Sequence, residues 1–314
     1  MNTHVLVTGG AGFIGSHAVE RLLAAGHRVT VLDDFSTGSM AKLAAVAAHP
    51  ALTVVKGDVV EPFGPQLAGL DAAPTHVLHL AAQVSVARSM DEPELDLRTN
   101  LLGTIRAVEY AREVRADKIV LASSAAVYGD CGVPAHEGLV PQPLSPYGLH
   151  KLAGEHHLAV AAKAHGLGAL SLRFFNVFGP RQDPQSHYAG VISIFIKRAL
   201  AGEPLALFDS GRATRDFVYV GDIVTAATRA LFAGPREGEA FNVGTGRPTS
   251  VRQLAEAVVA LTGSRSELVD RPPRAGDVVD SLAQVERIAD ALGFRAETSL
   301  EAGLAATAAF FAPV

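Results

Sequence analysis

The sequence predicts an α/β fold, with a doubly wound parallel sheet followed by a smaller α/β lobe, from two observations. The first is a strand, a glycine turn and a helix at the N-terminus. His4 to Thr8 is an apolar run too short for a helix, glycines follow at 9, 12 and 15, and Phe13 to Ala25 is apolar at helical spacing. The second is that strands and helices alternate as far as Phe174, which right-handed crossovers convert into a parallel sheet.

Each further element is predicted by the length and period of its apolar run. The predicted strands are Val29 to Leu32, Leu52 to Val55, Thr75 to Leu80, Lys118 to Ala122 and Gly168 to Phe174. The predicted helices are Leu95 to Arg115, Lys151 to His165 and Val191 to Leu200. Ligands bind at the carboxyl ends of the strands in such sheets. The residues expected at that edge are Gly9, Asp33, Asp58, Ala81, Ser124 and Asn176.

The domain boundary is expected near residue 173. Residues 1–173 are predicted to form the first domain, with a return near 216–245, where Phe241 to Gly244 has the pattern of a strand end. Residues 174–314 are predicted to form most of the second lobe, which is rich in turns and arginines. No internal repeat marks either part.

Composition is that of a globular enzyme of 314 residues, with 48% hydrophobic and 19% charged residues. A net charge of -5 argues against nucleic acid as the main partner. The single cysteine, Cys131, excludes an internal disulfide, and its expected role is that of a bystander thiol. A cytoplasmic location is expected, since neither a secretory signal nor a membrane-spanning run is recognised.

The N-terminal turn carries the features of a dinucleotide site. Glycines let the backbone approach a pyrophosphate, and the start of the helix offers free N–H groups. Asp33 lies 18 residues after Gly15, close to the spacing of the acid that binds the adenosine ribose. A carboxylate there repels a 2′-phosphate, so NAD is predicted over NADP. The alternative, a purely structural turn, explains the glycines but not the acid.

Tyr147 and Lys151 are four residues apart, so both lie on one face of a helix that Tyr147 would open. Tyrosine is a poor base at its usual pKa of about 10. A nearby ammonium and a nicotinamide ring favour the phenolate and bring it toward the working range. Ser124, at a strand end, is placed to bond the same reacting oxygen. By itself the pair also fits a helix cap and a solvated lysine.

The chain resembles the extended short-chain dehydrogenases/reductases, and within them the nucleotide-sugar 4-epimerases of the UDP-glucose/UDP-galactose type. The segments that carry the resemblance are Thr8 to Gly15, Asp33-Asp34, Gly57-Asp58, Asn100, Ser123 to Gly129, Tyr147 to Lys151, Arg173 to Asn176, Thr214 to Asp216 and Arg274 to Asp277. The resemblance implies a tightly held NAD and a UDP-sugar substrate. It implies that Ser124 and Tyr147 act on the sugar 4-hydroxyl while Lys151 binds the nicotinamide ribose.

The same resemblance implies the binding residues. Cofactor contacts are expected from Gly9, Gly12, Phe13, Ile14, Gly15, Asp33, Asp34, Ser36, Thr37, Gly38, Asp58, Val59, Leu80, Ala81, Ala82, Asn100, Tyr147 and Lys151. Substrate contacts are expected from Ser124, Asn176, Arg215, Arg274, Asp277 and Ser281. Arginine suits a diphosphate because its planar fork makes two hydrogen bonds at once. No metal site is expected, because the pairs His76/His79 and His156/His157 lack ligand geometry.

Ser281 is the expected gatekeeper of the sugar 2-substituent in the epimerases resembled. Serine is small, so acetamido sugars are predicted to be accepted along with, or instead of, plain hexoses. Another interpretation makes Ser281 the N-cap of a helix that starts near Leu282. The two interpretations are compatible.

Three departures from the family's pattern and three alternative functions remain. His150 stands where the motif usually has serine, Val84 replaces a lysine of some epimerases, and Gln83 fits a neighbouring subgroup. A dehydratase or decarboxylase is disfavoured because Ala125 and Ala126 stand where it needs acids. A UDP-glucuronate 4-epimerase and a non-catalytic NAD-binding module also stay open. The helices over 95–115 and 151–165 resemble a pair that forms a four-helix bundle between subunits, which predicts a homodimer.

Overall fold

The structure is a computed structural model that describes residues 3–183, 190–234, 236–273 and 280–312. The chain divides into two compact units. The first comprises Met1–Gly129, Val140–Arg173 and Val224–Phe241, and the second comprises Asp130–Leu139, Phe174–Ile223 and Asn242–Val314. Among the described residues, no helix is long and apolar enough to cross a membrane.

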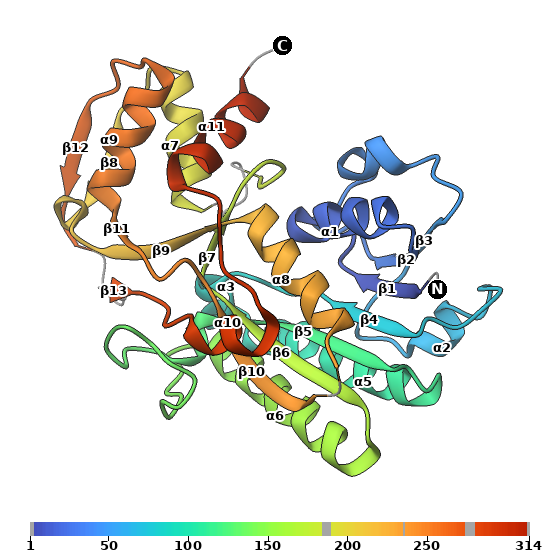
Figure 1. Ribbon diagram of the computed structural model, residues 1–314. Helices are drawn as coiled ribbons and strands as arrows, with labels where there is room; N and C mark the ends of the chain where they lie inside the picture. Colours follow the sequence, from blue (N-terminus) through green and yellow to red (C-terminus); the bar gives the residue numbers. More distant parts are fainter. Residues whose placement is uncertain (1–2, 184–189, 235, 274–279, 313–314) are drawn as a thin grey trace. The chain divides into compact units, whose positions relative to one another are not determined.

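A seven-stranded sheet in the order β10-β6-β5-β4-β1-β2-β3 is the framework of the first unit (Figure 1). Its strands are β1 (His4–Thr8), β2 (Arg28–Asp33), β3 (Leu52–Lys56), β4 (His76–His79), β5 (Lys118–Ser124), β6 (Gly168–Phe174) and β10 (Glu237–Val243). Strand β1 lies in parallel register between β2 and β4, with Val5 opposite Val29 and Val7 opposite Leu78. The predicted doubly wound parallel sheet is therefore confirmed.

Helices cover both faces of this sheet (Figure 1). The longer ones are α1 (Phe13–Ala24), α5 (Gly103–Glu113), α6 (Pro146–His165) and α8 (Val220–Phe232), and the shorter ones are α2 (Phe63–Gln66), α3 (Val86–Asp91) and α4 (Pro93–Asp96). Helix α6 has clear local signals at both ends. Ser145 caps its start by accepting the Gly148 N–H, and Gly166 ends it with a left-handed φ of 66°.

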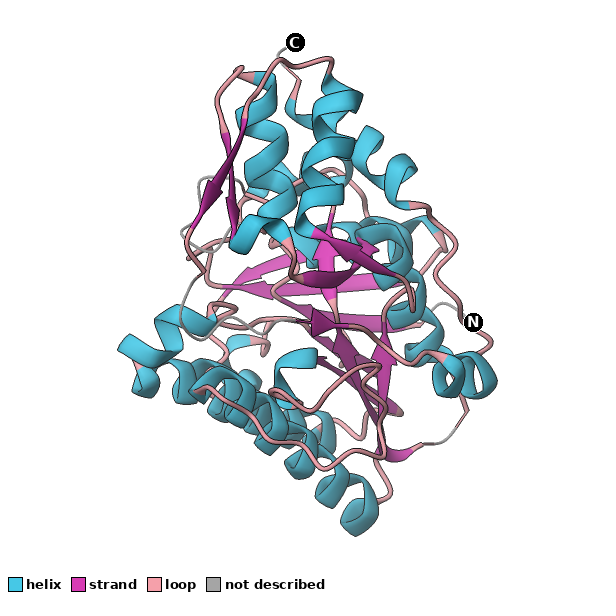
Figure 2. Ribbon diagram, turned by 90° about the vertical axis from the view of Figure 1, so that its left-hand side faces the viewer, coloured by secondary structure: helices cyan, strands magenta, loops and turns pink. Residues whose placement is uncertain are grey.

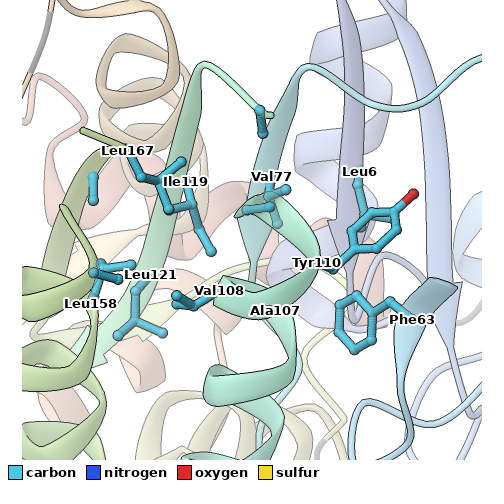
Figure 3. Close-up of a cluster of buried hydrophobic side chains, with 14 of the residues drawn as sticks. Leu6, Phe63, Val77, Ala107, Val108, Tyr110, Ile119, Leu121, Leu158 and Leu167 are labelled. Atoms are coloured by element: carbon cyan, nitrogen blue, oxygen red, sulfur yellow. The ribbon is translucent and has the colours of Figure 1, made fainter. Parts of the chain in front are cut away.

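The core beneath the sheet explains why α5 and α6 pack where they do. Leu6, Val77 and Ile119 point down from three adjacent strands, and Val108 of α5 and Leu158 of α6 meet them (Figure 3). All five side chains are at most 1% exposed. Burying such side chains stabilises the fold by about 1.5–3 kcal/mol each.

The predicted helix over 95–115 is present but is built from three pieces. It begins with α4, widens into a π-helical segment over Leu97–Leu102, and continues as α5. The wider turn carries Asn100 into the interior, where it is 1% exposed. Apolar periodicity does not reveal such a local widening, which is frequent at functional sites.

The second unit holds a small sheet and a helical cluster. The sheet contains β7 (Asn176–Phe178), β9 (Thr214–Tyr219), β11 (Pro248–Ser250) and β13 (Asp280–Ser281), and a separate pair is formed by β8 (Leu205–Phe208) and β12 (Leu268–Arg271). Its helices are α7 (Val191–Leu200), α9 (Val251–Thr262), α10 (Glu286–Leu292) and α11 (Leu300–Phe311). Apolar residues of α7, α9, α11 and β8 form its core, and Figure 2 shows those helices in cyan beside the strand pair in magenta.

The prediction that Ser281 caps a helix starting near Leu282 is wrong. Ser281 belongs to β13 and lies opposite Arg215 in parallel register with β9. The chain stays extended beyond it, because the Leu282 carbonyl accepts the Ala135 N–H at 2.8 Å. Strand pairing satisfies these backbone groups, and the next helix begins only at Glu286.

Candidate active site

The glycine turn after β1 packs so closely against neighbouring backbone atoms that side chains would not fit. Gly9 has a φ of +68°, and a Cβ there would lie 2.8 Å from the Ala81 backbone. A Cβ on Gly15 would lie 2.1 Å from the Gly9 carbonyl oxygen. Gly12 occupies the N-cap of α1 and offers no side-chain acceptor, so the first N–H groups of the helix are available to an anion. This cradle fits the pyrophosphate of a dinucleotide.

Asp33 lies beside this cradle at the end of β2. Its Oδ2 accepts the Ala11 N–H and its Oδ1 accepts the Phe35 N–H, each at 2.9 Å. Burial raises the pKa of Asp33 above its usual value, and the two backbone donors oppose that rise. Gly38 packs so near that a Cβ would lie 2.6 Å from Oδ1. The carboxylate is thus held at the turn, in a place that fits an adenosine ribose.

Most of the remaining cofactor candidates lie just past other strand ends of the same sheet. After β3, Asp58 accepts the Val60 N–H at 3.0 Å. After β4, the Ala81 N–H donates to Thr8 Oγ1 at 3.2 Å, which fixes the loop of Leu80, Ala81 and Ala82 beside the glycine turn. Asn100 is buried with its Oδ1 lacking a partner among the described residues, an acceptor that a bound ligand can use. The residues of the 34–38 loop (Asp34, Ser36, Thr37 and Gly38) follow Asp33 directly.

Ser124, Tyr147 and Lys151 are brought together at the carboxyl edge of the sheet. Ser124 is the last residue of β5, and its side chain is hydrogen-bonded to Tyr147. Tyr147 lies in the first turn of α6 and is 8% exposed. Burial raises the pKa of Tyr147, the bond to Ser124 lowers it, and the charge of Asp96 raises it further. A bound cation or positive ring is what would bring this phenol toward its working range.

Lys151 lies one turn along α6 from Tyr147. Its Nζ donates to the Ala122 carbonyl oxygen at 2.9 Å and lies 5.9 Å from the centre of the Tyr147 ring. Burial lowers the pKa of Lys151 to about 8, against the opposing charges of Asp96 and Glu155. The ammonium is therefore anchored to β5 and supplies positive charge beside the phenol.

Two buried acids that the sequence did not single out complete these surroundings. Asp96 accepts from His150 Nδ1 at 2.7 Å, and Glu155 pairs with Arg173 at 2.7 Å. The one local signal for Asp96 is its position four residues before Asn100, to which it is hydrogen-bonded at 2.9 Å. The pairing with His150 spans 54 residues and leaves no pattern in the sequence.

The substrate candidates that the structure describes outside the first unit lie in the small sheet. Asn176 begins β7 and lies opposite Phe217 of β9. Arg215 on β9 is half-buried, and its Nη1 donates to the Thr214 carbonyl oxygen at 2.8 Å. Ser281 is its neighbour on β13. Arg274 and Asp277 lie outside the described residues.

Asp216, next to Arg215, anchors this sheet. It is fully buried and accepts from Thr245 and Gly246 backbone N–H groups at 2.8 and 2.9 Å, and from the Ala283 N–H at 3.2 Å. Burial raises its pKa, and these bonds oppose the rise. The Thr-Arg-Asp motif thus combines a half-buried arginine with a structural acid.

Metal binding and the reactivity of the single cysteine can be judged from the surroundings of the described side chains. Across the described ranges, no group of three or more His, Cys, Asp or Glu residues is placed to hold a metal ion. Cys131 is half-buried, and burial raises the pKa of its thiol, which disfavours the thiolate.

A glycine cradle, a ribose acid and a Ser-Tyr-Lys cluster at one edge of a doubly wound sheet define the class: an NAD-dependent enzyme of the extended short-chain dehydrogenase/reductase type. The model of the NAD dependent epimerase/dehydratase family matches residues 5–244. The chain belongs to this family.

Its relatives are similar over almost the whole length. A "UDP-glucose 4-epimerase" of Mycolicibacterium smegmatis is 42% identical over 98% of this chain and 97% of its own. The structure of a Thermotoga maritima UDP-glucose 4-epimerase with UDP-glucose has a TM-score of 0.91 and 38% identity, with 98% of each chain covered. A UDP-N-acetylglucosamine 4-epimerase from Methanobrevibacter ruminantium has a TM-score of 0.93 and 32% identity, covering 99% of this chain and 98% of that one.

Proposed function

We propose that this enzyme is an NAD-dependent UDP-hexose 4-epimerase that inverts C4 through a transient 4-keto sugar. The observation that carries the proposal is the Ser124–Tyr147–Lys151 cluster at the edge of a sheet that also holds the glycine cradle and Asp33. The relatives named UDP-glucose 4-epimerase support this activity. When bound, NAD supplies a hydride acceptor that returns the hydride, so the reaction is redox-neutral.

The roles of the three residues follow from their contacts. Tyr147 removes the proton of the 4-hydroxyl and later returns a proton to the same oxygen. Ser124, already bonded to Tyr147, aligns and polarises that oxygen. Lys151 keeps its ammonium beside the phenol, which stabilises the phenolate and offers a donor to the nicotinamide ribose.

Substrate binding is assigned to the second unit. Asn176, Arg215, Arg274 and Asp277 are proposed to contact the UDP portion, with the arginines on the diphosphate. Ser281 is proposed to border the sugar 2-substituent. Its small side chain supports acceptance of UDP-N-acetylglucosamine and UDP-N-acetylgalactosamine, and a structural neighbour is named for such a substrate.

A dehydratase or decarboxylase is the second candidate reaction, because relatives at 32% and 30% identity carry those names. In this chain Ala125 and Ala126 form a short 3-10 turn directly after Ser124. Methyl groups there provide no acid or base for elimination. This feature favours epimerisation of a neutral UDP-hexose or of a UDP-glucuronate over either loss reaction.

The enzyme is proposed to act as a cytoplasmic homodimer. Large apolar side chains are exposed on α6 and on the helical segment before α5. They are Leu149 at 52% and Val160 at 66% on α6, Leu97 at 43% on the π-helical segment, and Met90 at 60% on α3. A second copy of the chain, packing the same helices against them, would bury this surface. A single cysteine is consistent with a reducing compartment.

One preparation tests the proposal. Protein purified without added cofactor is denatured, and the released nucleotide is identified as NAD or NADP. The native protein is then incubated with UDP-glucose, UDP-N-acetylglucosamine and UDP-glucuronate separately. The expected result is NAD and a C4-epimeric mixture without net oxidation. A dehydrated or decarboxylated product would favour the second candidate, and bound NAD without any conversion would favour a non-catalytic module.

A further inference from the structure

Asp96 is the buried centre of a hydrogen-bond cluster in the first unit. Its Oδ2 accepts from Gln83 Nε2 at 2.7 Å and from Asn100 Nδ2 at 2.9 Å, and its Oδ1 faces His150 Nδ1 at 2.7 Å. Asp96 is 0% exposed and His150 is 7% exposed. An ionised carboxylate only accepts, so Nδ1 carries the proton and donates. The short bonds are those of a charge-assisted network.

This cluster reaches the catalytic pair through one helix. Tyr147, His150 and Lys151 occupy positions i, i+3 and i+4 of α6, so they share a face. The charge of Asp96 raises the pKa of Tyr147 and also that of Lys151. The negative charge of Asp96 therefore disfavours the phenolate form of Tyr147 and favours the ammonium form of Lys151.

We propose that Asp96 and His150 form a positioning pair that sets the charge behind Tyr147 and Lys151 and ties their helix to the segment carrying Asn100. His150 holds the Asp96 carboxylate in place through its Nδ1–H, and that carboxylate favours the ammonium form of Lys151. The proposal rests on the proposed function, because it takes Tyr147 as the residue that moves the 4-hydroxyl proton.

Three other groups that face Tyr147 and Lys151 are Glu155, His79 and Ser124. On α6, Glu155 is paired with Arg173 of β6, which offsets its charge. On β4, His79 is fully buried, and burial lowers its pKa to about 3, so it stays neutral at working pH. On β5, Ser124 contributes a hydroxyl and no charge.

The remaining ionisable groups near the cluster lie toward solvent. On α3, Arg88 bonds Glu92 at 2.9 Å in a partly exposed pair, and Asp91 is exposed. On α4 and the π-helical segment, Glu94 and Arg98 are exposed. Solvent screens all of these charges, so Asp96 is the charge whose removal is felt at Tyr147.

Removing the charge of Asp96 is expected to move the pH profile of kcat, whereas replacing its His150 donor by another neutral donor is not. Asp96→Asn removes the negative charge, so Tyr147 ionises more readily and Lys151 loses its proton sooner. Both limbs of the profile then shift to lower pH by about one unit. His150→Gln keeps a neutral donor to the carboxylate, so both limbs stay in place. Glu92→Gln, which removes an exposed carboxylate nearby, leaves the profile unmoved.

The double variant and a spectroscopic titration separate this idea from a purely structural role. In Asp96→Asn/His150→Gln both limbs shift to lower pH as they do in Asp96→Asn, because the pair then carries no charge. Ultraviolet titration of tyrosinate, read as the difference between each protein and its Tyr147→Phe counterpart, follows the same order without any substrate. That titration still reports on the pair if the sugar or the reaction is different.

The outcomes that overturn the proposal are specific. Lower kcat or lower thermal stability with unmoved pH limbs makes the cluster structural only. A shift in His150→Gln as large as that in Asp96→Asn rejects the assignment of this charge to Asp96. Should Asp96→Asn fail to fold, the tyrosinate titration of Asp96→Asn/His150→Gln decides alone, and an unshifted Tyr147 rejects the proposal.

Discussion

Arg173 on β6 and Glu155 on α6 form a buried, two-pronged ion pair. Arg173 Nη2 lies 2.7 Å from Glu155 Oε2, Arg173 Nε lies 3.0 Å from Oε1, and each residue is 5% exposed. Ser123 donates to the same carboxylate, and Arg173 also bonds the Tyr128 hydroxyl at 2.9 Å. The pair joins the helix that carries Tyr147 and Lys151 to the sheet.

Glu155→Gln is expected to destabilise the protein by about 3–5 kcal/mol, because it leaves the Arg173 guanidinium buried without its counter-charge. Urea unfolding followed by circular dichroism measures the loss. The matched control is Glu109→Gln in the partly exposed pair with Arg106, which is 2.9 Å long, and its loss is expected to stay below about 1 kcal/mol. Equal effects in the two variants would contradict the buried-charge explanation.

Tyr147→Phe is expected to lower turnover by about two to four orders of magnitude, the contribution of a general acid–base. NAD should stay bound, since the glycine cradle and Asp33 are untouched. The measurements are the nucleotide released on denaturation and the rate of UDP-hexose conversion. Turnover near that of the wild type would remove Tyr147 from the mechanism.

Asp33→Ala is expected to weaken NAD binding and to relax the discrimination against NADP. The carboxylate that would repel a 2′-phosphate and bond the ribose is lost, and so are the acceptors for the Ala11 and Phe35 N–H groups. Reconstitution with each nucleotide and titration of bound cofactor give the ratio. Wild-type protein that copurifies with NADP would show that Asp33 does not select the cofactor.

Activity and stability are expected to respond oppositely to rising pH above about 8. Burial lowers the pKa of Lys151 to about 8 from its ordinary value of 10.5. Between these values the unfolded chain binds more protons than the folded one, so stability rises with pH while the catalytic ammonium is lost. Turnover and melting temperature measured from pH 7 to 10 should therefore diverge, and Lys151→Met should abolish this rise in stability.

Ser281→Tyr is expected to remove activity on the acetamido sugars while sparing plain UDP-hexoses. Ser281 lies in β13 next to Arg215, so a bulky ring there fills space beside a proposed UDP contact. Rates on UDP-glucose and UDP-N-acetylglucosamine are compared, with Ser281→Ala as the size-matched control. Loss on both substrates in the tyrosine variant, or a wild type without acetamido activity, would reject the gatekeeper role.

Local signals were sufficient to predict the elements that build the cofactor cradle. Glycines at 9, 12 and 15, a short apolar strand before them and an acid at the next strand end are all readable along the chain, because turns and strand ends depend on neighbouring residues. The strand Gly168–Phe174 and the helix Val191–Leu200 have the predicted bounds for the same reason. The 95–115 helix was predicted as a whole, but its π-helical turn was not.

The sequence by itself determined the fold class and which residue types lie at the ends of successive strands. These features depend on periodicity and glycine placement, which involve only residues close together in the chain. Only the tertiary structure decided which buried charges meet. Asp96 finds His150 and Glu155 finds Arg173 because a carboxylate removed from water must take whatever donors packing brings to it, however distant in the chain. Ser281 likewise depends on distant residues. It is a strand residue because pairing with Arg215 of β9, 66 residues earlier in the chain, outweighs the local preference of serine for a helix start.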